Sequence, residues 1–464
     1  MKTVYRPEML YVDGRFVANA ELVVGDGGEV TETREVRELG LGVDGCLVVE
    51  MKGKALLPGF ANAHSHSFQR LIRGKAESRA VSGRDFWSWR GTMYYAASSL
   101  DPQQVYDVAR MAFLEMALAG TTTVGEFHYL HNAPDGRPYE DPNLLAKQVI
   151  AAARSVGLRM VLLRTAYLRA GYELPSDPGQ RRFYETATDY IANMEALVRE
   201  CSGNAADVRF GVAPHSLRAV PLRELHEIAD WARANKLPLH MHVAEQIAEN
   251  EACLREYGAA PVALLDREGL LGRDFTAVHA VHVSDEEIAM LAETGVTVCS
   301  CPTTERNLGD GIFRADDAMT AGVRVALGSD SQAQIDPLED ARELEYHLRL
   351  ARQKRAVLDA GGETLAARLF ECVTVSGSGS LGVAGGDLRV GALADFFTVD
   401  LQDVSIAGNS AEDLLAIMVF GLNRSAIRDV AVEGRLIVRD GIHAQQDEIV
   451  ARYKEVYESV WRGR

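Results

Sequence analysis

Histidine residues gather at a few places in this sequence, with a spacing that could hold a metal ion. His64 and His66 are separated by one residue, so on a strand both imidazoles point to the same side, as two ligands of one metal must. His242 could supply a third neutral nitrogen, and Asp330, in the run ALGSDSQ, could supply a carboxylate oxygen. Three His and one Asp around an open position are typical of a catalytic metal site.

Three side chains near these ligands could move protons. Glu245 follows His242 by three residues, so it could reach a metal-bound water or a substrate nitrogen. His279 could orient an attacking hydroxide, and Asp330 could accept the proton of the water that it helps to bind. Because a metal lowers the pKa of bound water from ~15.7 towards ~7, hydroxide would be available at neutral pH. His240 shares a strand face with His242, and we expect it to lie beneath the ligands as a polar core residue.

Taken one at a time, these motifs also have structural explanations. An HxH pair can simply close a strand, Asp330 can cap the next helix, and His279 can be a strand-end residue without a chemical role. Their combination, and the elements that carry them, favour a catalytic site over these separate structural roles.

Those elements form a regular alternation of apolar runs with helical patterns. The eight candidate strands are residues 59–65, 121–127, 159–165, 208–214, 237–243, 275–281, 296–300 and 323–329. Helical patterns such as 102–120 and 142–157 lie between them, and the first ends on a glycine suited to a helix terminus. We therefore expect an α/β fold with a (β/α)₈ TIM barrel, in which catalytic groups collect at the carboxyl ends of the strands. A doubly wound sheet also alternates strands with helices, so the number of predicted strands alone does not distinguish it from a barrel.

The sequence pattern differs at both ends of the chain, where short predicted strands are separated by Gly and Asp turns. We expect residues 1–57 and 378–446 to form one small β-sandwich domain, discontinuous in sequence. The barrel would occupy residues 58–377, and residues 447–464 would form a C-terminal helix.

Composition excludes several classes of partner. The 464 residues include 49 Lys and Arg and 66 Asp and Glu, a net charge of −17, which argues against nucleic acid or an anionic membrane surface. Six scattered cysteines without a CxxC pair indicate a reducing compartment. The N-terminus lacks an apolar signal-peptide region, and there is no run of about 18 apolar residues, so we expect a cytoplasmic protein without a membrane partner.

Together the motifs resemble the amidohydrolase superfamily, and within it the mononuclear aminohydrolases. The residues that carry the resemblance are HxH at 64–66, HxxE at 242–245, His279 and Asp330, with no Lys on the fourth strand to bridge two metals. The resemblance implies one divalent ion, with Zn²⁺ preferred over Fe²⁺, held by His64, His66, His242 and Asp330. It also implies proton transfer by Glu245, His279 and Asp330, and a homodimer.

A narrower resemblance is to the formimidoylglutamate deiminases. It rests on NAHSHSFQRLIRG (62–74), DFWSWRGTMYY (85–95), GEFHYLH (125–131), APHSLRAV (213–220) and CPTTERNLGDG (301–311). It implies that metal-bound hydroxide attacks the formimidoyl carbon of N-formimidoyl-L-glutamate, giving N-formyl-L-glutamate and ammonia in histidine degradation.

Such a small-molecule substrate carries two carboxylates, which need guanidinium forks or equivalent donors. The family pattern places Arg90 and Arg218 in this role, with Gln69, Tyr129 and His215 as further hydrogen-bonding candidates near the same mouth. The expected pocket is therefore positive at its carboxylate end, although the chain as a whole is acidic.

Two alternatives stay open. A deaminase of a purine, pyrimidine or triazine ring would use aromatic stacking and amide groups, and would leave the two Arg unexplained. A non-catalytic barrel that only binds metal would not require Glu245, His279 and Asp330 together.

Overall fold

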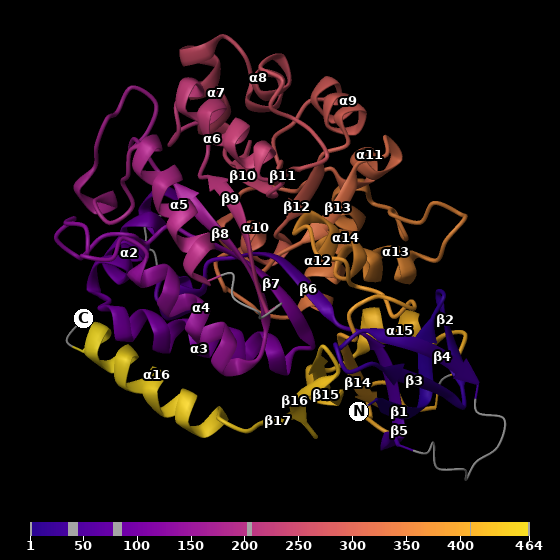
Figure 1. Ribbon diagram of the computed structural model, residues 1–464. Coiled ribbons are helices and arrows are strands. Elements are labelled where there is room, and N and C mark those ends of the chain that lie inside the picture. The colour runs from indigo at the N-terminus through magenta and orange to yellow at the C-terminus, as the bar shows by residue number, and fades with distance from the viewer. Residues whose placement is uncertain (1, 36–44, 78–85, 202–206, 409, 463–464) are drawn as a thin grey trace.

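Eight parallel strands surround the centre of the molecule (Figure 1) in the computed structural model, which describes residues 2–35, 45–77, 86–201, 207–408 and 410–462. The strands are β6 (Phe60–Ser65), β7 (Thr121–His128), β8 (Arg159–Ala166), β9 (Val208–Pro214), β10 (Leu239–Val243), β11 (Phe275–His279), β12 (Thr297–Ser300) and β13 (Arg324–Leu327). They pair in sequence order from β6 to β13. Almost all of their residues are buried, polar ones included, as expected of parallel strands covered by helices.

The barrel closes where β13 approaches β6. Asp330 N donates to His64 O at 3.0 Å and His66 N donates to Asp330 O at 3.0 Å, so the closing bonds join the predicted metal ligands. Gly328 permits this approach, because a Cβ there would lie 2.8 Å from His64 N and O. The closure of the barrel thus fixes the backbone of three candidate ligands.

The predicted barrel is confirmed, and each of its eight strands overlaps the strand expected from the sequence. The strand ends differ by at most two residues. The expected helices at 102–120 and 142–157 are present as α3 (Pro102–Leu118) and α4 (Leu144–Val156). Gly120 and Gly157 follow them with φ of 85° and 90°, values that favour glycine.

Strands from both chain ends form a second sheet, as predicted. Its strands are β1 (Thr3–Val12), β2 (Arg15–Ala18), β3 (Ala20–Val24), β4 (Val30–Glu35), β5 (Leu47–Pro58), β14 (Phe396–Asp400), β15 (Ile427–Val432), β16 (Arg435–Arg439) and β17 (Ile442–His443). β5 joins the two ends, because it pairs in parallel with β1 and antiparallel with β14. The domain boundaries at 57/58 and 377/378 stay predictions, and β5 itself runs to Pro58.

Helices cover the outside of the barrel (Figure 1). The remaining ones are η1 (Ser67–Ile72), α2 (Phe86–Ser99), η2 (Pro178–Gln180), α5 (Ala187–Cys201), α6 (Leu222–Ala234), α7 (Ile247–Tyr257), α8 (Pro261–Arg267), α9 (Asp285–Thr294), α10 (Pro302–Leu308), α11 (Ala315–Thr320), α12 (Pro337–Arg352), α13 (Leu365–Cys372), α14 (Val375–Ser380), α15 (Leu414–Gly421), η3 (Arg424–Ala426) and α16 (Gln446–Trp461). None of the helices in the described ranges is long and apolar enough to cross a membrane.

The C-terminal helix expected at 447–464 is α16, which ends at Trp461 and lies alongside α3 (Figure 1). Arg110 on α3 pairs with Glu448 at 2.8 Å, and Trp461 Nε1 donates to Leu71 O at 3.1 Å. The chain's last helix therefore supports η1, the turn that follows the HxH pair.

Candidate metal centre and active site

The four predicted metal ligands converge at the carboxyl ends of the barrel strands. The ligand atoms of His64, His66, His242 and Asp330 all lie within 4.8 Å of one another, and all four residues are buried. His64 Nε2 is 3.2 Å from Nε2 of both His66 and His242. Asp330 Oδ1 is 3.3 Å from His64 Nε2 and 3.1 Å from His66 Nε2. The ligand set inferred from spacing is thus brought together in space.

The surroundings of the imidazoles suit metal binding. His66 Nδ1 lies 2.8 Å from Phe127 O and His242 Nδ1 lies 2.9 Å from His215 O, so each ring can donate to a carbonyl and turn the Nε2 lone pair inward. Burial lowers the pKa of His64 to about 3 and holds that of His242 well below its ordinary value. Neutral rings are the form that binds a metal. The donor types, their convergence and their orientation therefore fit a divalent ion.

Unusual backbone conformations mark this end of the barrel. Ala244, His279, Ala280 and Asp330 have positive φ values of 52°, 74°, 50° and 46°. Non-glycine residues adopt this region at a cost of roughly 1–3 kcal/mol, and such residues cluster at functional sites. The turns aim His279 and Asp330 at one point from two different strands.

His279 lies among three carboxylates. Its Nε2 is 3.8 Å from Glu245 Oε1 and 3.9 Å from Asp330 Oδ2, and its Nδ1 is 3.3 Å from Glu305 Oε1. Burial lowers the pKa of His279, but Glu245, Glu305 and Asp330 outweigh it and hold that pKa well above its ordinary value. The three proton-moving candidates therefore form one cluster, with Glu305 behind it.

Glu245 has an environment suited to acid–base work. Burial raises its pKa to about 7; the charges of Asp330 and Glu249 add to the effect, while His279 and Arg218 oppose it. A carboxyl group that titrates near neutral pH can both accept and donate a proton there.

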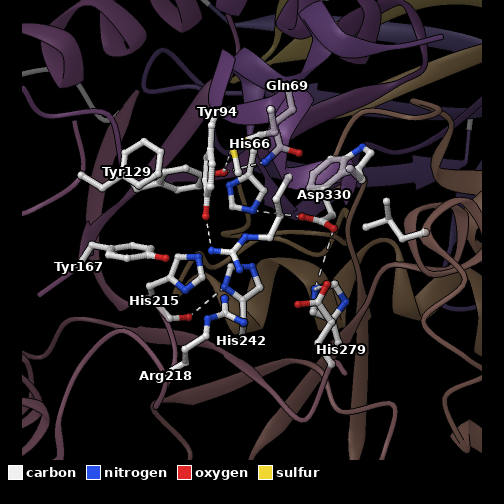
Figure 2. A pocket seen from close by; sticks show the side chains of 16 residues that line it. His66, Gln69, Tyr94, Tyr129, Tyr167, His215, Arg218, His242, His279 and Asp330 are labelled. Carbon is white, nitrogen blue, oxygen red and sulfur yellow. Dashed lines mark hydrogen bonds and ion pairs between the residues drawn. The ribbon is translucent and has the colours of Figure 1, made fainter. Parts of the chain in front are cut away.

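A pocket that is partly open to solvent extends from this cluster (Figure 2). It is lined by His66, Gln69, Trp89, Arg90, Met93, Tyr94, Tyr129, Tyr167, Phe183, His215, Arg218, His242, Glu245, His279, Leu308 and Asp330. Every predicted substrate residue is among them. In Figure 2, Arg218, His215 and Tyr167 lie on one side, and Asp330 and His279 on the other.

Two guanidinium groups reach the side of the pocket that carries Tyr94. Arg90 Nη2 donates to Tyr94 OH, one turn further along α2. Burial raises the pKa of Tyr94 to about 12, while Arg90 and Arg218 both act to lower it. After burial, Arg218 is also the largest influence that lowers the pKa of His215. Arg90 and Arg218 thus share one positive region of the pocket.

The uncharged substrate-binding candidates also line the pocket. Gln69 Nε2 donates to Tyr129 OH at 2.7 Å, and Gln69 Oε1 is buried with no partner among the described residues. The His215 ring packs against Tyr167 and His242, with centroids 4.6 and 4.7 Å apart. His240 lies outside this set, because its Nε2 meets Ser380 O at 2.8 Å, as expected for a core histidine.

Sequence reasoning missed four residues that shape the site. These are Tyr94, Tyr167, Gln180 and Glu305. Two carried a signal: Tyr94 stands four residues after Arg90, on the same helix face, and Glu305 lies in the CPTTE run. Gln180 carried no such signal, because it lies in a loop that is far in sequence from the motifs of the site.

Comparisons with known proteins show what the chain as a whole is similar to. The model of the Amidohydrolase family matches residues 55–437. Formimidoylglutamate deiminase of Pseudomonas aeruginosa is 36% identical over 409 residues, 88% of this chain and 90% of that protein. The 5-methylthioadenosine/S-adenosylhomocysteine deaminase of Haloarcula marismortui is 28% identical over 97% of this chain and 94% of that protein.

Solved structures give the same fold. The amidohydrolase from Brucella melitensis superposes with a TM-score of 0.90 at 32% identity, covering 99% of each chain. An adenosine deaminase from Xanthomonas campestris, solved with bound zinc, has a TM-score of 0.82 at 21% identity, covering 99% of this chain and 98% of that one. The chain therefore belongs to the amidohydrolase family, as a deaminase-type hydrolase of C–N bonds.

Proposed function

We propose that the protein hydrolyses N-formimidoyl-L-glutamate to N-formyl-L-glutamate and ammonia. The observation that carries the proposal is the pair Arg90 and Arg218, which places two guanidinium groups in the pocket that opens onto the metal ligands. Two carboxylates on the substrate would match them, since guanidinium binds carboxylate through paired hydrogen bonds. The relative from Pseudomonas aeruginosa supports the same substrate.

His64, His66, His242 and Asp330 would hold the metal, with Zn²⁺ preferred and Fe²⁺ as the alternative. A divalent ion there supplies Lewis acidity and makes water a nucleophile near neutral pH. Water adds to the formimidoyl carbon, so a C–O bond forms and the bond to the terminal nitrogen then breaks. That nitrogen takes up protons and leaves as ammonia.

The chain's own residues supply the proton path and the orientation. Glu245, with a pKa of about 7, can take a proton and return it to the leaving nitrogen. His279, held by Glu305, faces the same point through Nε2. Gln69 Oε1 is a buried acceptor that suits a substrate N–H.

A comparison of substrates tests the proposal. Ammonia release is measured with N-formimidoyl-L-glutamate, guanine, cytosine and S-adenosylhomocysteine. We expect release from the first alone. Release only from a ring would favour the heterocycle deaminase, the second candidate, which the aromatic side chains Tyr94, Tyr129, Tyr167 and Phe183 and the 28% identical relative support. No release from any of them would favour the non-catalytic barrel.

Arginine variants test the carboxylate contacts. Arg90→Met and Arg218→Met should each raise KM about 10- to 100-fold, because a hydrogen bond to a charged group contributes ~1.5–3 kcal/mol. N-formimidoylglycine, which has one carboxylate, should lose affinity with only one of the two variants. Arg137→Met, at a position whose side chain is 85% exposed, is the control. Unchanged KM in both pocket variants would contradict this account.

Histidine degradation is the pathway that follows from this substrate. The cytoplasmic location stays a prediction from the sequence, and the homodimer stays an expectation from the family resemblance.

A further inference from the structure

A second group of metal-binding side chains lies beside the first. The donor atoms of His279, Cys301 and Asp330 lie within 4.8 Å of one another, and all three residues are buried. Asp330 belongs to both groups but offers each a different oxygen. Its Oδ1 faces His64 and His66, whereas its Oδ2 is 3.9 Å from Nε2 of His279. One carboxylate can therefore bridge two ions, as in paired sites with ions ~3.5–4 Å apart.

His279 has the surroundings of a metal ligand, although it is outside the first group. Its Nδ1 faces Glu305 Oε1 at 3.3 Å, which leaves Nε2 turned towards Asp330 and towards Glu245, 3.8 Å away. A ring nitrogen held by a carboxylate is the usual arrangement behind a zinc-bound histidine. The orientation of the ring is therefore already set for an ion at Nε2.

The local charge favours a cation at this point. Glu245, Glu305 and Asp330 surround one imidazole, and all three carboxylates are buried. Cys301 stands at the N-terminus of α10, just after β12, and its backbone N donates to Glu305 Oε1 at 2.8 Å. A thiolate beside imidazole and carboxylate selects soft ions such as Zn²⁺ and Cd²⁺ over Mg²⁺ or Ca²⁺.

We propose that His279, Cys301 and Asp330 form a second and weaker site for a thiophilic divalent cation, and that filling it inhibits hydrolysis. When the ion binds, a metal–sulfur bond forms, and the thiol proton of Cys301 and the proton that the neighbouring carboxylates hold on His279 Nε2 both pass to solvent, with no change of oxidation state. His279 is then engaged by the ion through Nε2 and cannot move protons. The second ion acts as an inhibitor, in contrast to the one held by the first group.

Metal stoichiometry tests the site without any substrate. Metal-free protein receives one equivalent of Zn²⁺ and is then titrated with Cd²⁺, while bound metal and the ultraviolet sulfur-to-cadmium absorption are measured. We expect a second equivalent and the absorption band in the wild type, and neither in Cys301→Ser or Cys301→Ala. Cys372→Ala, which removes a buried cysteine on α13, is the matched control and should behave as the wild type.

Each outcome decides the question. A single equivalent in the wild type overturns the proposal, as does a band that persists in both Cys301 variants, because cadmium would then sit on another thiol. Retention of the first zinc by Cys301→Ser shows that the variant is folded. In the activity arm, which rests on the proposed function, excess Zn²⁺ should inhibit the wild type at concentrations at least about tenfold lower than Cys301→Ser. If formimidoylglutamate is not a substrate, the stoichiometry still tests the site.

Discussion

Glu305 is the residue that holds His279 in place from behind. Its carboxylate accepts from Cys301 N and from Ser300 Oγ and lies 3.3 Å from His279 Nδ1. Glu305→Gln removes the negative charge and keeps the shape. We expect kcat to fall about 10- to 100-fold with little change in KM, because partners behind a reacting or ligating histidine have effects of that size.

The control for Glu305 is Glu293→Gln, an exposed position on α9 that should leave both constants unchanged. A change of KM alone in Glu305→Gln would show that the residue shapes the substrate pocket instead of positioning His279.

At the scale of single residues, the sequence predicts what strand geometry dictates. His64, His66, His242 and Asp330 are predictable because residues that end parallel barrel strands must meet at one rim. Gln180 is not, because its place depends on how a long loop folds back over the barrel. Functional residues at strand ends can therefore be predicted from their spacing in the sequence, whereas functional residues on loops cannot.

The loop between β8 and α5 lines the pocket through Phe183, and Gln180 on η2 holds two of the lining tyrosines in place. The Gln180 amide donates to Tyr94 OH at 2.6 Å and to Tyr167 OH at 2.9 Å, and its oxygen accepts from Tyr184 OH at 2.9 Å. Gln180→Leu leaves Tyr94 without its restraint beside Arg90. We expect KM to rise about tenfold with kcat nearly unchanged, since two hydrogen bonds contribute ~1–3 kcal/mol.

Gln103→Leu, at an exposed position on α3, is the control for Gln180. A fall in kcat at constant KM would place the effect of Gln180 at the reacting groups instead of the carboxylate end.

The same loop is tied to the barrel by an ion pair that predicts a pH dependence. Glu185 Oε1 accepts from Arg164 Nη2 at 2.7 Å. Burial raises the pKa of Glu185, but His131 and Arg164 outweigh it and lower that pKa to about 2. The unfolded chain has a Glu pKa of ~4.3, so the folded carboxylate stabilises the protein at neutral pH, and this stabilisation is lost as pH falls from ~4 towards ~2.

Glu185→Gln should therefore be less stable than the wild type at pH 7, with the difference shrinking as the pH falls towards that of the folded carboxyl group. Urea unfolding at a series of pH values measures it, with the exposed Glu173→Gln as control. A difference that stays constant with pH would contradict the ion-pair assignment.

At the scale of elements, the strands are predictable and their ends are less so. Buried parallel strands are continuous apolar runs, which the sequence displays directly. The expected strands at 275–281 and 323–329 are longer than β11 and β13, because the chain turns at His279, Ala280 and Asp330 with positive φ. An apolar run does not reveal such turns, so these two strands end two residues earlier than expected, whereas β10 (Leu239–Val243) differs by two residues at its other end.

At the scale of the whole molecule, Arg159 links the barrel to the sheet made by the chain ends. It is the first residue of β8 and is fully buried. Its Nη2 lies 3.3 Å from Asp395 Oδ1, just before β14, and 3.1 Å from Glu433 Oε1 after β15. Asp395 also accepts from Glu433 N at 2.8 Å, so three distant segments meet in one network.

Arg159→Met should destabilise the protein by ~3–5 kcal/mol, because it leaves buried carboxylates without their cation. Arg154→Met is the matched control: this arginine pairs with Asp207 at 2.9 Å, but its side chain is 39% exposed, and such pairs contribute ~0–1 kcal/mol. The midpoints of urea unfolding measure the change in stability of both variants. Adding Asp395→Asn to Arg159→Met should recover part of the loss, since it removes one unpaired charge. Equal effects of Arg159→Met and Arg154→Met would show that the contact between the two sheets does not depend on this network.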